Sequence, residues 1–272
     1  VIGMFMNCGV DTKNKRWPTS ISWQNEEKDV RRVCKKLGIE LIVKDCGAGY
    51  ERKVISQMFN DYNAGLTPNP DILCNNVGKF PLLYTIMRER KADFIATGHY
   101  VRVKQDRKSG KAKLYVGKDT KKDQSYFLIG LGQKYLSKCL FPIGDLTKDA
   151  VRRCAQKKGF TNWDKAGSRG ICYLGKIDVK DFLKSRLGTK KGDIVDESGV
   201  VIGSHMGSFL FTIGETITDS KGTVLNKEGR KKYSSDKLYV SKKKKGNILV
   251  VSTKNSTALY VKEVAIKGFK TI

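Results

Sequence analysis

Short apolar runs alternate with helical patterns over the first hundred residues, and this alternation constrains the fold more than any other feature. The strand-like runs cover residues 1–6, 39–43 and 93–97, and the helical patterns cover residues 25–37, 50–62 and 77–90. A strand followed by a crossover helix and another strand is the unit from which parallel sheets are built. The alternation therefore predicts an α/β domain with a parallel sheet.

The pattern changes after residue 97. A hairpin is expected where residues 100–104 and 113–117 flank Ser109 and Gly110. Further helices are expected at residues 133–138, 148–158 and 179–186, and short strands at residues 193–196, 200–202, 209–213, 238–240 and 248–251. Short strands separated by Gly, Ser and Asp turns are typical of a small barrel or sandwich. Three domains are therefore predicted, at residues 1–130, 131–190 and 191–272, the last of them β-barrel-like and incomplete.

The charge of the chain points to a polyanionic partner. Among 272 residues, 53 are Lys or Arg and 27 are Asp or Glu, which gives a formal net charge of +26. An excess of this size favours binding of nucleic acid. A solvated surface or a Lys-rich proteome is the alternative explanation. No apolar run approaches the length of a membrane span, so a cytoplasmic protein without a membrane partner is expected.

The cysteines limit the metal and redox chemistry of the chain. The seven cysteines are at positions 8, 34, 46, 74, 139, 154 and 172, and no two of them are closer than 12 residues. This spacing predicts no bound zinc and no metal site. In a reducing compartment scattered thiols are usually buried, and a disulfide would be transient and catalytic. Burial in helical patterns accounts for Cys34 and Cys154 but not for all seven.

Two segments place a cysteine in a setting that favours reactivity. Cys74 follows Asp71 by three residues in a Pro-stiffened loop just before a helix, where backbone N–H groups favour a thiolate and the carboxyl can exchange a proton. The alternative is a helix cap followed by a buried cysteine. Cys172 lies in a loop between Gly170 and Gly175. Two loop cysteines suggest a thiol pair.

Two further segments could bind a ligand. Gly98 and His99 end a predicted parallel strand, which is where open α/β sheets bind ligands. A turn histidine with satisfied hydrogen bonds is an equal alternative for His99. Residues 121–127 combine charged, amide and aromatic groups that suit phosphate and base contacts. A solvated helix start is the alternative for that segment.

Taken together, five collinear motifs resemble the tRNA-specific 2-thiouridylases (the MnmA/TrmU family). They read AGLTPNPDILCN at 64–75, ATGHY at 96–100, KDQSYFL at 122–128, LFPIGDLTK at 140–148 and GICYLG at 170–175. The resemblance implies a Rossmann-like sheet of the nucleotide-hydrolase type, a mostly helical tRNA-binding central domain and a C-terminal β-barrel. It also implies an ATP-dependent sulfurtransferase that thiolates carbon 2 of the wobble uridine.

The resemblance assigns roles to particular residues. Cys172 would carry a persulfide, Cys74 would release its sulfur and form a disulfide with Cys172, and Asp71 would handle protons. Met6 and Gly98 would line the adenine pocket of ATP, which is expected with Mg²⁺. The residues implied to contact tRNA are Asn69, Pro70, Asp71, His99, Lys122, Asp123 and Gln124. The sulfur would come from a cysteine desulfurase or a persulfide relay protein.

Departures from the family pattern leave two alternatives open. The SGGVDS phosphate loop is absent, residues 167–169 read GSR where the family usually has DSQ, and residues 212–216 lack the family's GQR. An enzyme whose given chain lacks the first strand, the phosphate loop and the C-terminal end is expected, and it could be inactive in this form. A non-catalytic tRNA-binding relative is the alternative. A redox-sensing dithiol protein is a third reading, but it leaves the +26 charge unexplained.

Overall fold

The computed structural model describes residues 1–8, 23–165, 178–219 and 222–266. It consists of two compact units, which are described separately. The first unit comprises Val1–Gln57 and Asn69–Ile177, and the second comprises Met58–Pro68 and Asp178–Lys270. The boundaries expected at residues 130 and 190 do not coincide with this division. The three-domain organisation stays a prediction.

The first unit begins with a parallel strand pair, as the alternation predicts. β1 (Ile2–Asn7) pairs with β2 (Glu40–Asp45) from Ile2↔Glu40 to Asn7↔Asp45. α1 (Trp23–Leu37) connects them and ends at Gly38, whose φ of 64° is a left-handed conformation that glycine adopts without strain. Cys34 of α1 is buried, as expected, and lies directly over Gly3 of β1.

Two helical stretches of the chain each contain a wide turn. The earlier stretch consists of α2 (Gly47–Tyr50), η1 (Glu51–Ile55) and α3 (Ser56–Asn63), and the later one of α4 (Pro70–Leu73), η2 (Cys74–Lys79) and α5 (Phe80–Glu89). Both η1 and η2 are π-helical. The helical period of the apolar residues predicts these stretches. It does not predict the π turns, because a single wide turn leaves the apolar pattern of the sequence unchanged.

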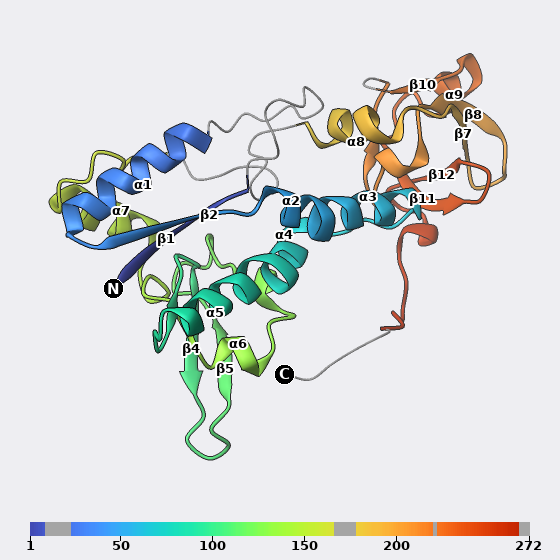
Figure 1. Cartoon of the computed structure of the whole chain (residues 1–272). Helices are drawn as coiled ribbons and strands as arrows, with labels where there is room; N and C mark the ends of the chain where they lie inside the picture. Colours follow the sequence, from blue (N-terminus) through green and yellow to red (C-terminus); the bar gives the residue numbers. More distant parts are fainter. Residues whose placement is uncertain (9–22, 166–177, 220–221, 267–272) are drawn as a thin grey trace. The chain divides into compact units, whose positions relative to one another are not determined.

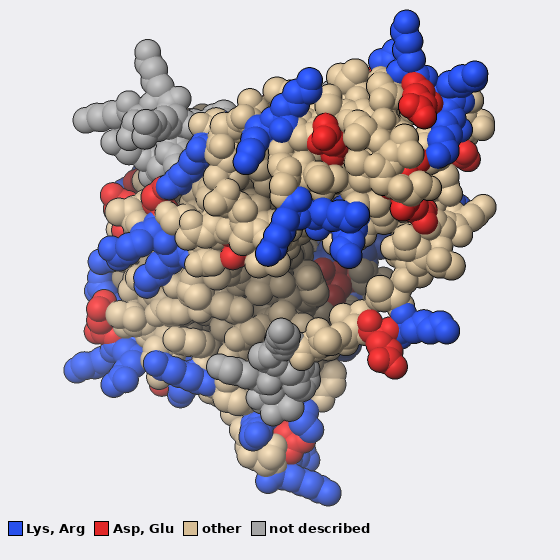
Figure 2. Space-filling model, turned by 90° about the vertical axis from the view of Figure 1, so that its right-hand side faces the viewer, with Lys and Arg blue, Asp and Glu red and all other residues tan. Residues whose placement is uncertain are grey.

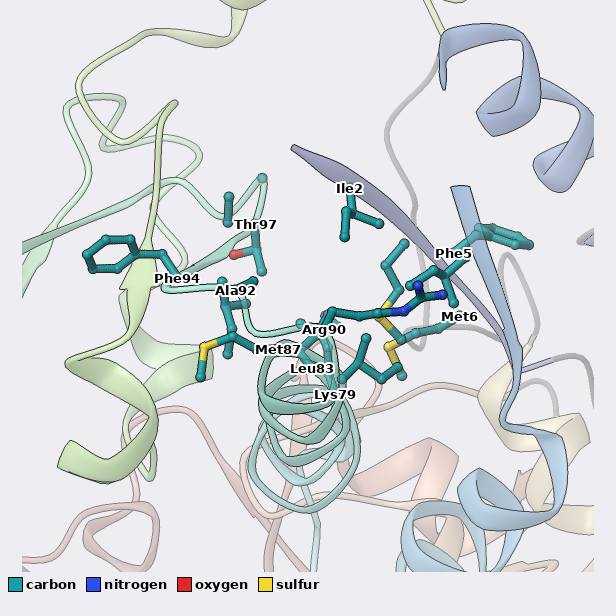
Figure 3. A pocket seen from close by; sticks show the side chains of 16 residues that line it. Ile2, Phe5, Met6, Lys79, Leu83, Met87, Arg90, Ala92, Phe94 and Thr97 are labelled. Carbon is teal, nitrogen blue, oxygen red and sulfur yellow. The ribbon is translucent and has the colours of Figure 1, made fainter. Parts of the chain in front are cut away.

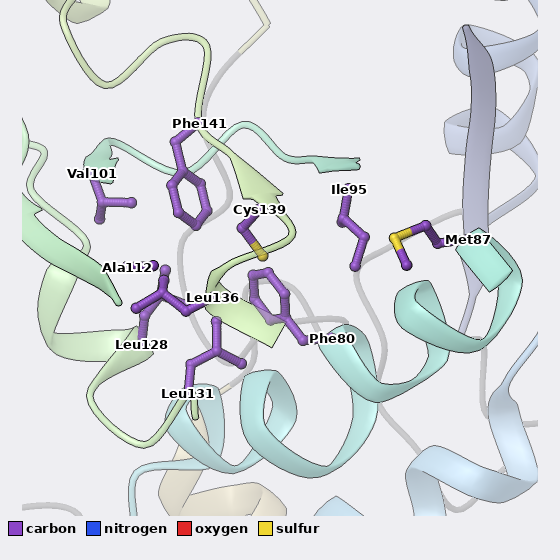
Figure 4. Packing of buried hydrophobic residues seen from close by; sticks show 10 residues of the cluster. All are labelled: Phe80, Met87, Ile95, Val101, Ala112, Leu128, Leu131, Leu136, Cys139 and Phe141. Carbon is purple, nitrogen blue, oxygen red and sulfur yellow. The ribbon is translucent and has the colours of Figure 1, made fainter. Parts of the chain in front are cut away.

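The rest of the first unit packs around one apolar cluster. β3 (Ile95–Ala96) pairs in parallel with β6 (Cys139–Leu140), and β4 (Val101–Gln105) forms the predicted hairpin with β5 (Ala112–Val116). The helical elements η3 (Ser125–Leu128), α6 (Gln133–Leu136) and α7 (Lys148–Lys157) complete it. Phe80, Leu128 and Leu136 are among its most deeply buried members, and α5 runs below the cluster in Figure 4. In the described residues of the first unit, the parallel strands form two separate pairs, β1–β2 and β3–β6.

The second unit is built on a six-stranded sheet in the order β10-β8-β7-β12-β11-β9. The strands are β7 (Gly192–Val195), β8 (Val201–His205), β9 (Thr216–Ile217), β10 (Thr223–Leu225), β11 (Leu238–Lys244) and β12 (Ile248–Thr253). β7 and β12 are parallel and the other pairs are antiparallel. The remaining helical elements are α8 (Val179–Leu187), η4 (Ser208–Leu210), α9 (Lys227–Lys232) and η5 (Thr257–Leu259). This sheet confirms the predicted barrel-like fold.

One predicted strand of this unit is wrong. Residues 209–213 form the end of η4 and an unpaired segment, not a strand. The reason is that the backbone N–H groups of Leu210 and Phe211 donate to the carbonyls of Gly207 (3.1 Å) and Ser208 (3.3 Å) within the turn, so they do not bond to a neighbouring strand. Gly207 and Gly214, with φ of 147° and 85°, turn the chain on either side.

Candidate active site

The Cys74 segment begins at a helix cap. Asn69 is extended, and its side-chain oxygen accepts hydrogen bonds from the backbone N–H groups of Asp71 (3.0 Å) and Ile72 (3.2 Å). Pro70 occupies the first turn of α4, where a missing N–H costs nothing. The helix cap that was one part of the alternative interpretation is therefore present. The side-chain oxygen of Asn69 bonds to the first turn of α4. Contact of Asn69 and Pro70 with a base stays a prediction.

The π turn that follows fixes Cys74 inside the first unit. Cys74 is buried, so the other half of that alternative, a buried cysteine after the cap, is present as well. The next residue, Asn75, donates a side-chain hydrogen bond to the carbonyl of Phe127 (3.1 Å). The Asn76 side chain lies very close to Gly130. A Cβ added at Gly130 would be 2.1 Å from Nδ2 of Asn76. π turns are frequent at functional sites because they redirect side chains within a helix. The segment after Cys74 is thus held against residues 127–130.

A cavity of about 320 Å³, here called the thiol cavity, opens beside Cys74. Its lining includes two cysteines, Cys46 and Cys74, and three lysines, Lys44, Lys53 and Lys79. Ammonium groups near a thiol favour the thiolate that acts as a nucleophile. Among the described residues Asp71 does not line this cavity. The proton-transfer role of Asp71 therefore stays a prediction.

A second cavity, of about 410 Å³ and here called the β1–β3 cavity, lies between β1 and the segment that contains β3. In Figure 3, β1 borders it on one side, residues 92–97 on the other, and α5 at its base. Its lining includes Met6 and Gly98, the two residues predicted to line one pocket, together with Lys79 and Arg90. Met6 and Lys79 line both cavities. The two cavities therefore share a wall.

His99 lies in the core beside this wall. It is only 7% exposed, its ring packs against Phe80 and Phe141, and its Nδ1 is 2.7 Å from Oγ1 of Thr97. Burial, assisted by the charge of Lys79, lowers the pKa of His99 to about 3. The side chain is consequently neutral at physiological pH. A contact between His99 and tRNA stays a prediction, and the packing gives the ring a structural part as well.

The pKa of His99 predicts a specific acid sensitivity. Its folded pKa lies below the ordinary value of 6.5, so the unfolded chain binds the extra proton and stability falls as pH drops below 6.5. From pH 7 to pH 5 the loss should be about 2 kcal/mol. Chemical denaturation of the wild type and of His99→Gln at both pH values measures it. The wild type should lose about 2 kcal/mol more than the variant; equal losses would contradict the assignment.

The predicted tRNA-binding segment 122–124 is partly engaged within the protein. Asp123 accepts hydrogen bonds from the N–H of Gly117 (2.8 Å) and the hydroxyl of Ser125 (2.6 Å), and these bonds lower its pKa against the effect of burial. Gln124 accepts from the N–H of Tyr100 (3.0 Å). Lys122 is exposed. Asp123 and Gln124 therefore brace the loop, and tRNA contact by the three residues stays a prediction.

Other features bear on the predictions in different ways. Cys172 lies outside the described residues. Within the described part of the chain, no group of three or more His, Cys, Asp or Glu side chains could hold a metal ion. No helix there is long and apolar enough to cross a membrane. Sequence reasoning missed Arg90 and Cys46 as cavity-lining residues. The position of Cys46 directly after a parallel strand was the signal that could have identified it.

Family models match both units. A tRNA methyl transferase HUP domain matches residues 1–176, and a tRNA methyl transferase PRC-barrel domain matches residues 180–253. The curated relatives include the tRNA-specific 2-thiouridylase MnmA 1 of Geobacillus kaustophilus, which is 38% identical over 262 residues, 96% of this chain and 67% of the relative. The MnmA of Buchnera aphidicola is 47% identical over 189 residues, 69% of this chain and 50% of the relative.

The fold is that of a HUP domain with a Rossmann-like sheet, followed by a PRC-barrel. The chain belongs to the family of the tRNA-specific 2-thiouridylases. It spans between about half and two thirds of the length of the curated relatives it matches.

Proposed function

We propose that this chain carries out ATP-dependent 2-thiolation of the wobble uridine of tRNA, with sulfur supplied as a cysteine persulfide. The observation that carries the proposal is the shared wall of Met6 and Lys79, which sets a cavity suited to a nucleotide next to one that contains the Cys74 thiol. The names of the curated relatives support the thiolation of tRNA.

The β1–β3 cavity fits an adenine nucleotide. Its volume lies within the usual range for small-ligand sites, and its lining combines apolar side chains with the cations Lys79 and Arg90. Met6 and Ile2 would pack against the base, Gly98 leaves room beside it, and the cations would attract phosphates. When bound, ATP supplies the activation that turns the oxygen on carbon 2 into a leaving group. Mg²⁺ is proposed with it.

The sulfur step uses two thiols in this proposal. The outer sulfur of a Cys172 persulfide bonds to carbon 2 as the oxygen leaves. The Cys74 thiolate then attacks the Cys172 sulfur, which breaks the sulfur–sulfur bond and leaves one sulfur on the uridine. A Cys74–Cys172 disulfide forms, and an external thiol reduces it before the next turnover. The persulfide would come from a cysteine desulfurase or a relay protein.

Surface charge supports tRNA as the substrate. Figure 2 shows Lys and Arg side chains over much of one face, with fewer Asp and Glu among them. The formal net charge is +26. Lysine and arginine side chains bind the nucleic-acid backbone by releasing its counterions. The exposed Lys121 and Lys122 lie beside the braced loop at 123–124 and would contact tRNA phosphates.

The descriptions of the family models and relatives differ, since the models are described by methyl transfer and the relatives by thiolation. We favour thiolation because the thiol cavity, which adjoins the β1–β3 cavity, contains the Cys74 thiol and three lysines. Lysines near a thiol favour the thiolate that acts as a nucleophile. Mass spectrometry of the tRNA product separates the two. A sulfur-for-oxygen exchange supports thiolation, whereas an added methyl group would overturn it.

A substitution in the β1–β3 cavity tests the nucleotide part of the proposal. In the full-length product of the gene, Gly98→Leu should weaken ATP binding at least about tenfold, because Gly98 lines the β1–β3 cavity and a leucine adds four carbon atoms to its wall. Calorimetric titration measures the affinity. Gly132→Leu, at an exposed site with nothing within 4 Å of an added Cβ, is the matched control. Unchanged ATP binding by Gly98→Leu would place the nucleotide elsewhere.

A further inference from the structure

Two cysteines lie at the ends of neighbouring parallel strands in the first unit. The last pair in the β1–β2 register is Asn7↔Asp45, and Cys8 and Cys46 are the next residues (Figure 1). The backbone N–H of Cys46 donates to the carbonyl of Asn7 (2.7 Å), so the strands stay together at this point. Adjacent strands are about 4.8 Å apart. Disulfides bridge Cα atoms about 4.4–6.8 Å apart. This range includes the strand spacing at the Asn7↔Asp45 pair just before the two cysteines, and the thiols of Cys8 and Cys46 are within hydrogen-bonding reach of each other.

The two side chains differ in access. Cys8 is 1% exposed, whereas Cys46 is partly exposed and lines the thiol cavity. The Cys46 thiol donates to the carbonyl of Lys44 (3.3 Å). A hydrogen bond from the Cys8 thiol lowers the pKa of Cys46, as does the charge of Lys44, while burial and Asp45 act in the opposite direction. Cys46 is therefore the accessible nucleophile, and Cys8 is the thiol held directly behind it.

The cavity in front of Cys46 favours anions. Its lining holds three lysines, Lys44, Lys53 and Lys79, and one carboxylate, Asp45, and its volume of about 320 Å³ lies within the range of small-ligand sites. Small thiols and disulfides that carry carboxylates, such as glutathione disulfide, match this charge. Cys74 lines the same cavity, so a reagent that reaches Cys46 also comes near the proposed catalytic thiol.

We propose that Cys8 and Cys46 form a second thiol–disulfide pair, which reacts with anionic small-molecule disulfides in the thiol cavity. The Cys46 thiolate attacks one sulfur of the small disulfide, which forms a mixed disulfide and releases one thiolate. Cys8 loses its proton and attacks the Cys46 sulfur, which forms the Cys8–Cys46 bond and releases the second thiolate. The two protein thiols are oxidised and the small disulfide is reduced. The pair does not depend on the proposed thiolation activity.

Peptide mapping tests the proposal, because each of the seven cysteines lies on a different tryptic peptide. The whole chain is equilibrated with mixtures of glutathione and glutathione disulfide, alkylated and digested. Residues 1–13 should be linked to 45–52 at least about tenfold more often than either is linked to another cysteine peptide. The link should persist in Cys74→Ser, a result that distinguishes the Cys8–Cys46 disulfide from the proposed Cys74–Cys172 disulfide. It should also persist in Cys34→Ser, which removes a buried thiol outside the cavity and serves as the control.

Single variants test the order of attack. In Cys8→Ser, glutathione should accumulate on peptide 45–52, because the thiol that would displace it is missing. In Cys46→Ser, peptide 1–13 should stay unmodified, because Cys8 is buried. Glutathione on Cys8 to the same extent in Cys46→Ser, or no 1–13 to 45–52 link in the wild type, would overturn the proposal. If Cys8→Ser does not fold, the 1–13 to 45–52 link in the wild type and the modification of peptide 1–13 in Cys46→Ser still test the proposal.

Discussion

Replacement of Cys74 by serine should abolish tRNA thiolation in the full-length product of the gene. The expected loss is about 10³-fold or more, since a hydroxyl at this position is a far poorer nucleophile than a thiolate. Cys74 lines a cavity with three lysines, and the π turn of η2 fixes it there. The measurement is the fraction of tRNA retarded on a mercury-containing gel after reaction with ATP and a sulfur donor. Cys172→Ser should have the same effect.

Two matched controls separate chemistry from folding. Cys34→Ser removes a buried thiol on α1. Cys154→Ser removes a thiol on α7 that is exposed, so the burial expected for Cys154 from its helical pattern is wrong: α7 buries none of its residues. Both variants should thiolate normally. Cys74→Ala should fail as completely as Cys74→Ser while avoiding a buried hydroxyl. The thermal midpoint of each variant confirms that the first unit remains folded. Wild-type product from a folded Cys74 variant would refute the nucleophile assignment and with it the persulfide mechanism.

The fold was predictable where apolar periodicity alone determines structure. The strands at β1 and β2 and the helix between them lie where the sequence indicates, because a continuous apolar run marks each strand and an apolar face marks the helix. Periodicity failed at residues 209–213, where the backbone N–H groups of Leu210 and Phe211 bond within the turn of η4 and not to a strand. It also failed at β9 and β10, which are too short to show an alternating pattern.

The candidate site was predictable only in part. Met6 and Gly98, which the resemblance implies for one pocket, both line the β1–β3 cavity. The burial of His99 depends on Phe80 and Phe141, which are distant in sequence, so local context could not reveal it. Likewise, Cys46 and Cys74 line one cavity because of how β2 and η2 pack. The spacing of the cysteines in the sequence does not predict this packing.

Gly144→Ala should strongly destabilise the first unit. A Cβ at this position would lie 1.9 Å from the carbonyl oxygen of Val101, a fully buried residue at the start of β4. The backbone cannot move away freely, because the carbonyl of Gly144 accepts a hydrogen bond from Lys118 (2.8 Å) and its N–H donates to Phe141 (3.0 Å). We expect a loss of about 3 kcal/mol or more. The thermal midpoint should fall by about 10 °C.

A second glycine in the same unit provides the control. Gly132 has nothing within 4 Å of an added Cβ, and its φ of −70° suits any residue, so Gly132→Ala should change stability by less than about 0.5 kcal/mol. Calorimetry of both variants and the wild type gives the comparison. Hydrogen exchange of the β4 and β5 amides shows whether the damage begins at Val101. If Gly144→Ala melts with the wild type, then the contact between residue 144 and β4 does not hold this unit together.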